Sequence, residues 1–137
     1  WPKVHNPNSG YRLAVTGAIK DTAIDYEDVA FYAAEYLLLA YPQLLRQRYK
    51  LESLPQSEME LIEAIAAVRG FKRAGGRIDM HKTCEVLLHE FRQGTLGKIC
   101  LETPQMAVKE QIEVEEKIAE QELLKAEKKK KRKSRRR

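Results

Sequence analysis

Residues 69–82 read Arg-Gly-Phe-Lys-Arg-Ala-Gly-Gly-Arg-Ile-Asp-Met-His-Lys, and this stretch sets the plan of the chain around it. Its glycines tolerate a positive φ and a close approach of the backbone to a partner, and they are Gly70, Gly75 and Gly76. Its cations are Arg69, Lys72, Arg73, Arg77 and Lys82. Asp79 is its single anion and stands where an N-cap is expected, just before an apolar-periodic run. The stretch therefore predicts a basic loop that leads into a helix, suited to phosphate or to a solvated link between two helices.

Helical patterns flank this loop on both sides. Before it, Ser57 and Glu60 match a capping box, which predicts a helix over 58–69 with Gly70 as its C′ residue. After it, apolar residues at helical spacing predict a helix over 80–92 that Gly94 stops. The apolar residues of this second helix are Met80, Cys84, Leu87, Leu88 and Phe91. The local plan is helix, basic glycine loop, helix.

The remaining segments also favour helices. Residues 1–10 are rich in turn formers and are expected to be irregular, and a short helix is predicted over 13–19. Asp25 can cap a helix over 26–41 that is apolar almost all round, as in the centre of a bundle. Pro42 should end it and begin a second short helix over 42–49, because the residue before a proline avoids the α region. The fold class predicted is all-α, a small helical bundle.

The end of the chain is charged. Residues 96–101 are expected to form a short extended piece or an ordered connection. A Glu-rich segment over 105–127 has good helix formers and a thin apolar stripe, which predicts a weakly docked helix. Residues 128–137 have no apolar side chain to bury and are expected to be disordered until they meet an anion. The bundle thus carries a charged C-terminal extension, part helical and part disordered.

The net charge of +5 is unevenly distributed. Residues 125–137 hold ten Lys/Arg and one Glu, whereas the other 124 residues hold 15 Lys/Arg and 19 Asp/Glu. Basic character therefore belongs to the tail and to the loop at 69–82, which favours two local contacts with an anionic partner over a uniformly basic globule.

Length and cysteine content bound the class of protein. A chain of 137 residues can form one domain whose core needs no disulfide or metal. The two cysteines, Cys84 and Cys100, make no disulfide framework and favour a reduced, cytosolic protein. No apolar run approaches a membrane span, so no membrane partner is expected. The sequence begins at Trp1 without an initiator Met, so we expect a piece of a longer polypeptide.

No catalytic constellation emerges from the residue types. The nearest approach to a P-loop, residues 70–77, lacks the lysine for the β/γ-phosphates and the hydroxyl for Mg²⁺. His81, Cys84 and His89 lie at helical spacing, but a second ligand pair of recognised spacing is missing, and Cys84 fits the apolar core. We therefore predict no enzymatic activity, no cofactor and no metal for this chain.

Several short motifs resemble a known family in order and spacing. They are LAVTGAIKD at 13–21, Tyr41-Pro42, Arg48-Tyr49, Arg69-Gly70, GGRID at 75–79, Lys82-Thr83 with Glu85, and Gly97. Over about residues 1–104 the chain resembles the C-terminal part of the ribosome biogenesis GTPase A family, of the YlqF type, in which a circularly permuted GTPase domain comes first. Trp1-Pro2-Lys3 is similar to what directly follows the Asp-Thr-Pro-Gly motif of that domain. That motif, the P-loop and the guanine-specificity motif are absent from this sequence.

The resemblance implies a helical domain similar to ANTAR-type RNA-binding domains, which helps a GTPase engage the maturing large (50S) ribosomal subunit. It implies as partners the large ribosomal subunit, ribosomal RNA and the GTPase domain of the same polypeptide, with GTP and Mg²⁺ held in that domain. The parent protein is then a cytoplasmic GTPase, and we expect a monomer. Residues 1–24 are the end of, or junction to, the GTPase domain, 25–103 the helical C-terminal domain, 104–127 an acidic helical extension and 128–137 a disordered polybasic tail. The extension beyond 104 departs from the compact family pattern.

Two sets of residues are predicted to contact ribosomal RNA phosphates. The loop set is Arg69, Lys72, Arg73, Gly75, Gly76, Arg77 and Lys82. The tail set is Lys128, Lys129, Lys130, Lys131, Arg132, Lys133, Arg135, Arg136 and Arg137. Two other functions stay open. One is a DNA-binding helix-turn-helix, although the loop is longer than the usual turn of about three to four residues. The other is a protein–protein module in which the Glu-rich segment serves as a partner helix.

Overall fold

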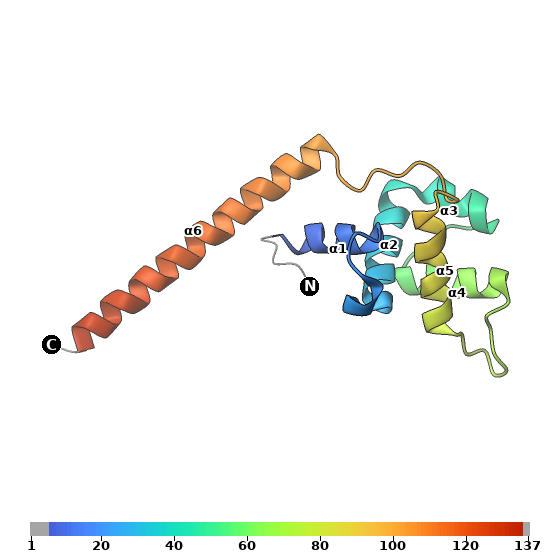
Figure 1. Cartoon of the computed structure of the whole chain (residues 1–137), viewed down its shortest axis with the longest axis horizontal. Helices are drawn as coiled ribbons and strands as arrows, with labels where there is room; N and C mark the ends of the chain where they lie inside the picture. The colour runs from blue at the N-terminus through green and yellow to red at the C-terminus, as the bar shows by residue number, and fades with distance from the viewer. Residues whose placement is uncertain (1–5, 136–137) are drawn as a thin grey trace. The chain divides into compact units, whose positions relative to one another are not determined.

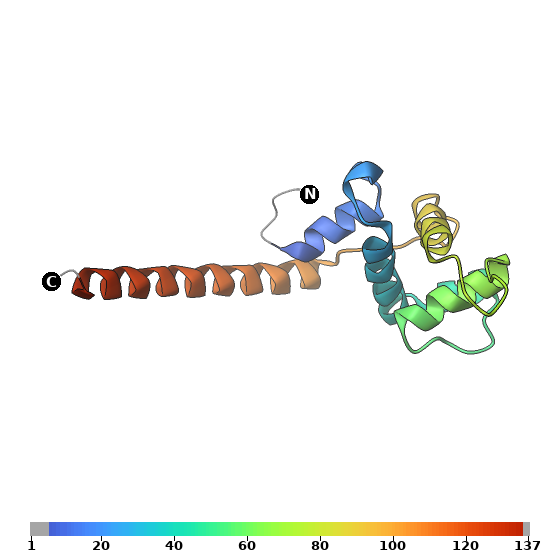
Figure 2. The ribbon, with the colours of Figure 1, turned by 90° about the horizontal axis from the view of Figure 1, so that it is seen from below.

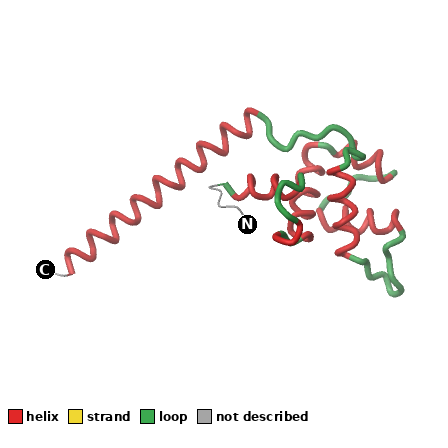
Figure 3. The backbone as a smooth tube through the Cα atoms, viewed as in Figure 1, coloured by secondary structure: helices red, strands yellow, loops and turns green. Residues whose placement is uncertain are grey.

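The computed structural model describes residues 6–135, and within them every named element is a helix, as the sequence predicts. The only β-type pairing among these residues is one isolated antiparallel bridge between Lys72 and Ile78. The chain divides into two compact units, one up to Ile99 and one from Cys100 onwards. Each is described by itself below (Figures 1 and 3).

Helix α2 (Tyr26–Ala40) is the centre of the first unit and packs against α1 (Pro7–Val15), α3 (Pro42–Tyr49), α4 (Glu58–Arg69) and α5 (Met80–Arg92) (Figure 1). Its fully buried side chains are Val29, Ala30, Ala33, Ala34 and Leu37. Three of these are alanines, which let neighbouring helices approach α2 closely. Leu, Ile and Val side chains from the surrounding helices complete the core.

The predicted helix starts are confirmed at three caps. Asp25 accepts the amides of Glu27 and Asp28, Ser57 accepts that of Glu60, and Asp79 accepts that of Lys82. Each side chain satisfies a backbone donor that has no partner inside its helix. Gly70 ends α4 with φ +73°, the left-handed conformation predicted for it. These caps fix where α2, α4 and α5 begin and where the loop after α4 leaves the helix.

The prediction for the first twenty residues was wrong in part. Residues 6–10 were expected to be irregular, yet α1 begins at Pro7, with Asn6 as N-cap accepting the amide of Asn8. Asparagine before proline is a favourable helix start, since proline lacks only an amide that would be unsatisfied there. The helix expected over 13–19 ends at Val15 instead, just before Gly17 with φ +80°. Residues 1–5, also expected to be irregular, lie outside the described residues.

Arg92 fastens the end of α1 to α5. Its Nε donates to the carbonyl oxygen of Val15 at 3.0 Å and its Nη2 to that of Ala14 at 2.9 Å. The same guanidinium forms an ion pair with Asp21, at 3.1 Å. The ring of Tyr11 also stacks on Tyr32 of α2, with centroids 4.9 Å apart. These contacts make the described part of residues 1–24 integral to the helical unit; its role as a junction to a GTPase domain stays a prediction.

Helix α6 (Pro104–Arg135) makes up most of the second unit and is one straight helix of 32 residues (Figure 2). None of its residues is buried. The helix continues through 128–135, where we expected disorder. Lysine and arginine are good helix formers, and cations near a helix C-terminus interact favourably with its dipole. The acidic first two thirds and basic last third of α6 therefore both favour the helix. Arg136 and Arg137 lie outside the described residues.

Candidate nucleic-acid interface

The loop between α4 and α5 folds as a short hairpin, which projects beyond the ends of both helices (Figures 1 and 3). The amide of Arg73 donates to the carbonyl of Arg77 at 2.6 Å, and that of Asp79 donates to the carbonyl of Phe71 at 3.0 Å. At the tip, the amide of Gly76 donates to the carbonyl of Arg73. Gly75 and Gly76 have φ of +87° and +79°, a conformation that side chains disfavour. We call residues 70–79 the hairpin loop.

The pairing of the hairpin loop sorts its side chains onto two faces. In an antiparallel pair, residues directly opposite one another share a face, and neighbours along the chain alternate. Lys72 opposite Ile78 defines one face. The bonds on either side of this bridge place the other loop side chains on the second face, and these are Phe71, Arg73, Arg77 and Asp79.

Two cations, one on the second face and one in α5, have partners on this face. Arg73 forms an ion pair with Asp79 at 2.9 Å, with both side chains partly exposed. Lys82, in the first turn of α5, places its Nζ 4.7 Å from the centroid of the Phe71 ring, a cation–π contact that adds its charge to this face. The hydrogen bond from the Lys82 amide, followed by that from Arg73, holds the pKa of Asp79 below its ordinary value. We call Arg73, Arg77 and Lys82 the cationic face.

Lys72 and Arg77 are exposed cations close to the turn of the hairpin loop. The backbone amides of Ala74 and Gly75 donate to no backbone carbonyl among the described residues. Amides of this kind, with cations beside them, can donate to phosphate oxygens. Of the predicted loop set, Lys72, Arg73, Gly75, Gly76 and Arg77 lie on the hairpin loop, and Lys82 contacts the loop from the first turn of α5.

Arg69 lies elsewhere, although sequence analysis grouped it with the loop. Its guanidinium forms an ion pair with Glu90 of α5 and lies 5.8 Å from the centroid of the Tyr49 ring. Its Nε is buried and has no hydrogen-bond partner in the structure. Arg69 therefore ties the end of α4 to α5, and its charge is largely neutralised within the fold.

Glu90 is the centre of a cluster that joins three helices. Its carboxylate accepts from Nε and Nη2 of Arg48 at 3.2 and 3.3 Å, from the Tyr49 hydroxyl at 2.8 Å, and from Arg69. Burial acts to raise the pKa of Glu90, but the hydrogen bonds from Arg48 and Tyr49 and the charge of Arg69 outweigh it, so the pKa lies below its ordinary value. Burial and the bond to Glu90 raise the pKa of Tyr49, which keeps its proton.

Sequence reasoning missed this cluster. Glu90 lies seven residues after Thr83, and both side chains lie on the buried side of α5 with Leu87. The signal in the sequence was therefore an acidic residue at a position that helical periodicity assigns to the buried side. A glutamate is buried only when it is paired, and the pairing arginines come from α3 and α4. The cluster sets the relative position of α4 and α5, and thereby of the hairpin loop between them.

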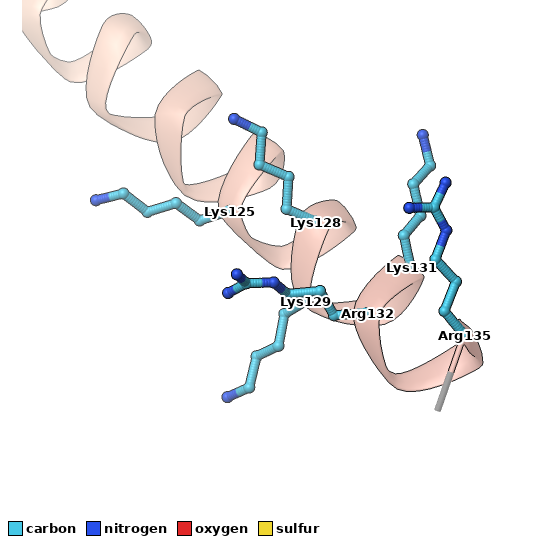
Figure 4. A pocket seen from close by; sticks show the side chains of 6 residues that line it. All are labelled: Lys125, Lys128, Lys129, Lys131, Arg132 and Arg135. Carbon is cyan, nitrogen blue, oxygen red and sulfur yellow. The ribbon is translucent and has the colours of Figure 1, made fainter. Parts of the chain in front are cut away.

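The tail residues that the structure describes, within 128–135, lie in the last turns of α6. Figure 4 shows the side chains of Lys125, Lys128, Lys129, Lys131, Arg132 and Arg135 pointing outward in different directions from the helix. The space between them, about 620 Å³, is bounded by one helix only, so it is a cleft between flexible side chains and not a preformed cavity. These side chains present positive charge in several directions around the helix. This arrangement suits binding of a polyanion but does not select a polyanion of particular shape.

The residues considered for a metal have other roles. Cys84 is buried in the core, and burial raises the pKa of its thiol to about 12. His81 is exposed and lies edge-on to the Tyr26 ring at 5.7 Å. His89 lines a pocket of about 300 Å³ in which Arg92 and Asp21 already satisfy one another. Within residues 6–135, no group of three or more His, Cys, Asp or Glu side chains is placed to hold a metal ion.

The fold and the loop define a small all-helical domain that presents a cationic hairpin, followed by a charged helix. No protein-family model matches the chain. Over 120 residues, 88% of its length, it is 46% identical to ribosome biogenesis GTPase A of Bacillus cereus. It is 43% and 41% identical to the proteins of the same name from Priestia megaterium and Bacillus pumilus, over 78% and 77% of its length.

The chain is thus a homologue of a part of ribosome biogenesis GTPase A, and the resemblance stated from the sequence is confirmed. It spans about two fifths of the length of these relatives, 40% of the first and 37% of the other two. Every helix in the described part of the chain is too short or too polar to cross a membrane.

Proposed function

We propose that this chain is the RNA-contacting part of a cytoplasmic factor that acts late in assembly of the large ribosomal subunit. The names of its relatives support ribosome biogenesis, and the observation that carries RNA contact is the cationic face, where Arg73, Arg77 and Lys82 oppose Asp79 alone. Two cations on the hairpin loop and one in the first turn of α5 suit the phosphates of a folded RNA, since phosphate contacts supply most nonspecific affinity. The basic end of α6 adds a second, less selective attraction.

The relatives are named GTPases, so we propose that GTP binding and hydrolysis with Mg²⁺ reside in a GTPase domain of the same polypeptide, outside these 137 residues. Within this chain the glycines of the hairpin loop follow helix α4, whereas a P-loop follows a strand. The purified chain should therefore show no GTP hydrolysis above buffer. GTP hydrolysis by the purified 137-residue chain would overturn the proposal that this activity resides in a separate GTPase domain.

The decisive test is charge reversal on the hairpin. Arg73→Glu with Arg77→Glu should weaken binding to isolated large subunits at physiological salt by at least tenfold, as two phosphate contacts become two repulsions. Reversal of two exposed cations outside the hairpin, Lys20→Glu with Lys98→Glu, is the matched control and should cost less than threefold. Equal affinity of the hairpin variant and the unaltered chain would sink the proposal for the loop.

Salt dependence and partner choice complete the test. If three to five phosphates are neutralised, log Kd should change with log salt with a slope of roughly 2 to 5 in magnitude. Deleting residues 125–137 should lower affinity without abolishing it. Complete loss on that deletion would mean that α6 alone tethers the chain. Duplex DNA that competes as well as ribosomal RNA would support the DNA-binding alternative instead.

A protein partner for α6 is the second candidate, because this helix exposes apolar side chains. Val108, Ile112 and Leu123 are 60%, 51% and 67% exposed and fall on one side of the helix by their spacing. An unpaired apolar stripe of this kind is typical of a helix that docks on another protein. Replacing all three with glutamine should weaken subunit binding only if a ribosomal or assembly protein holds α6.

A further inference from the structure

The hairpin loop holds an internal anion, Asp79, beside the cations of the cationic face. Asp79 lies on the same face as Arg73 and Arg77, and it accepts from Nη2 of Arg73 at 2.9 Å and from the Lys82 amide at 3.2 Å. A guanidinium also binds phosphate oxygens, with charge-assisted hydrogen bonds of the same kind. The carboxylate of Asp79 and an incoming phosphodiester can therefore compete for Arg73, while Asp79 goes on capping α5.

The ion pair is weak enough to be exchanged. The side chains of Arg73 and Asp79 are 70% and 30% exposed, and pairs in such positions are screened by water and contribute little to stability. Arg73 can therefore leave Asp79 for an incoming phosphate at small cost. By contrast, Arg69 is held by the buried Glu90 and is not available for such an exchange.

We propose that Asp79 is a specificity-determining residue of the RNA site, which holds Arg73 until a phosphate displaces the carboxylate from it. This inference rests on the proposed function. Asp79 lowers the net charge of the cationic face from +3 to +2, and its pair with Arg73 competes with a phosphate for that guanidinium, so isolated phosphates and flexible strands gain little binding free energy. A rigid RNA backbone that reaches Arg73, Arg77 and Lys82 together displaces the carboxylate from Arg73.

The test replaces Asp79→Asn, because asparagine keeps the N-cap of α5 while removing the charge. The variant should bind a duplex RNA of mixed sequence about three- to tenfold more tightly at low salt, as expected for removal of one like charge several ångströms from a phosphate. Glu63→Gln, which removes one exposed carboxylate from α4, is the matched control and should change affinity less than twofold. In an Arg73→Gln background the gain from Asp79→Asn should be largely lost.

A second measurement is independent of RNA. Titration of the full chain with inorganic phosphate should shift the Nε–H resonance of Arg73 in nuclear magnetic resonance spectra, with half-saturation at lower phosphate in Asp79→Asn. RNA affinity that is unchanged or weaker in this variant, with its helical content intact, would overturn the role of Asp79 and leave the proposed function standing. If the unaltered chain does not bind RNA but phosphate still shifts the Arg73 resonance, the anion site is supported and the proposed function is overturned. Absence of the shift in both proteins would overturn the site itself.

Discussion

Arg92 and Ala14 are joined across 78 residues of sequence, because Nη2 of Arg92 donates to the carbonyl oxygen of Ala14 at 2.9 Å. With the bond from Nε to Val15, one side chain satisfies two of the last carbonyls of α1, which have no partner inside the helix. The positive charge also lies at the negative end of the α1 dipole. The first helix is therefore held by α5 through a charged group as well as by apolar packing.

Removing this group should loosen α1. Arg92→Ala is expected to lower the free energy of unfolding by about 2 kcal/mol or more, because hydrogen bonds from a charged donor contribute more than neutral ones. The Val15 carbonyl loses its bond from Nε, and the Ala14 carbonyl keeps only the bond from the Gly17 amide. Arg77→Ala, which removes an exposed arginine, should change it by no more than about 0.5 kcal/mol. Urea denaturation followed by circular dichroism measures both. Equal losses in the two variants would show that Arg92 does not anchor α1.

Gly17 offers a second test of the same joint. Its φ is +80°, and a Cβ added there would lie 3.2 Å from Nε of Arg92. Gly94 has a similar φ of +72° but nothing within 4 Å of such a Cβ. Gly94→Ala should therefore cost only the backbone strain, about 1 kcal/mol, and Gly17→Ala should cost more, since it also displaces Arg92. Thermal melts of the two variants, compared directly, decide this; a larger loss in Gly94→Ala would contradict it.

The stability of the first unit should fall in acid, partly through Glu90. Its pKa is depressed in the folded chain, so its contribution is present above the ordinary glutamate pKa of about 4.3 and is lost as the pH falls through the lower folded value. Asp21 and Asp79, whose pKa values are also lowered, act in the same direction.

The variant Glu90→Gln isolates the part that Glu90 plays. It should be less stable at pH 7, by about 2 kcal/mol, because Arg48 and Arg69 lose their counter-ion while remaining partly hydrated. Its stability should also vary less between pH 6 and pH 3 than that of the unaltered chain. Unfolding free energies at a series of pH values give this comparison, and parallel pH profiles would mean that Glu90 is not ionised in the fold.

The two cysteines should differ sharply in reactivity. Cys84 is fully buried and burial raises its pKa to about 12, so almost no thiolate is present at pH 8. Cys100 is exposed. A thiol reagent at pH 8 should label one cysteine per chain quickly in the native state and both after denaturation, and Cys100→Ser should remove the fast phase. Rapid labelling of Cys84 in the folded Cys100→Ser variant would show that the core opens easily.

Local signals were enough to place most helices, because their boundaries depend on side chains a few residues away. Asp25, Ser57 and Asp79 each cap a helix as predicted, and Gly70 ends one. The early start of α1 was missed because Asn6 and Pro7 were read as turn residues, whereas the same pair is favourable at a helix start.

The site was harder to predict, because charges that share a segment of sequence need not share a surface. Arg69 and Arg73 are four residues apart, yet one pairs with buried Glu90 and the other with exposed Asp79. Glu90 is 21 residues from Arg69, and the contact depends on how α4 packs against α5. The division of the hairpin into two faces depends in turn on backbone pairing that glycine content alone does not specify.

The cluster around Glu90 also limits how this domain can diverge. Arg48, Tyr49 and Arg69 all donate hydrogen bonds to the Glu90 carboxylate, so a change at position 90 removes a partner from three side chains at once. In related chains, position 90 should therefore vary together with 48 and 69, with the set kept whole or replaced by apolar residues as a group. Lys72 and Arg77 are exposed on the hairpin loop and lie outside this cluster, so we expect each of them to vary independently of the other in related chains.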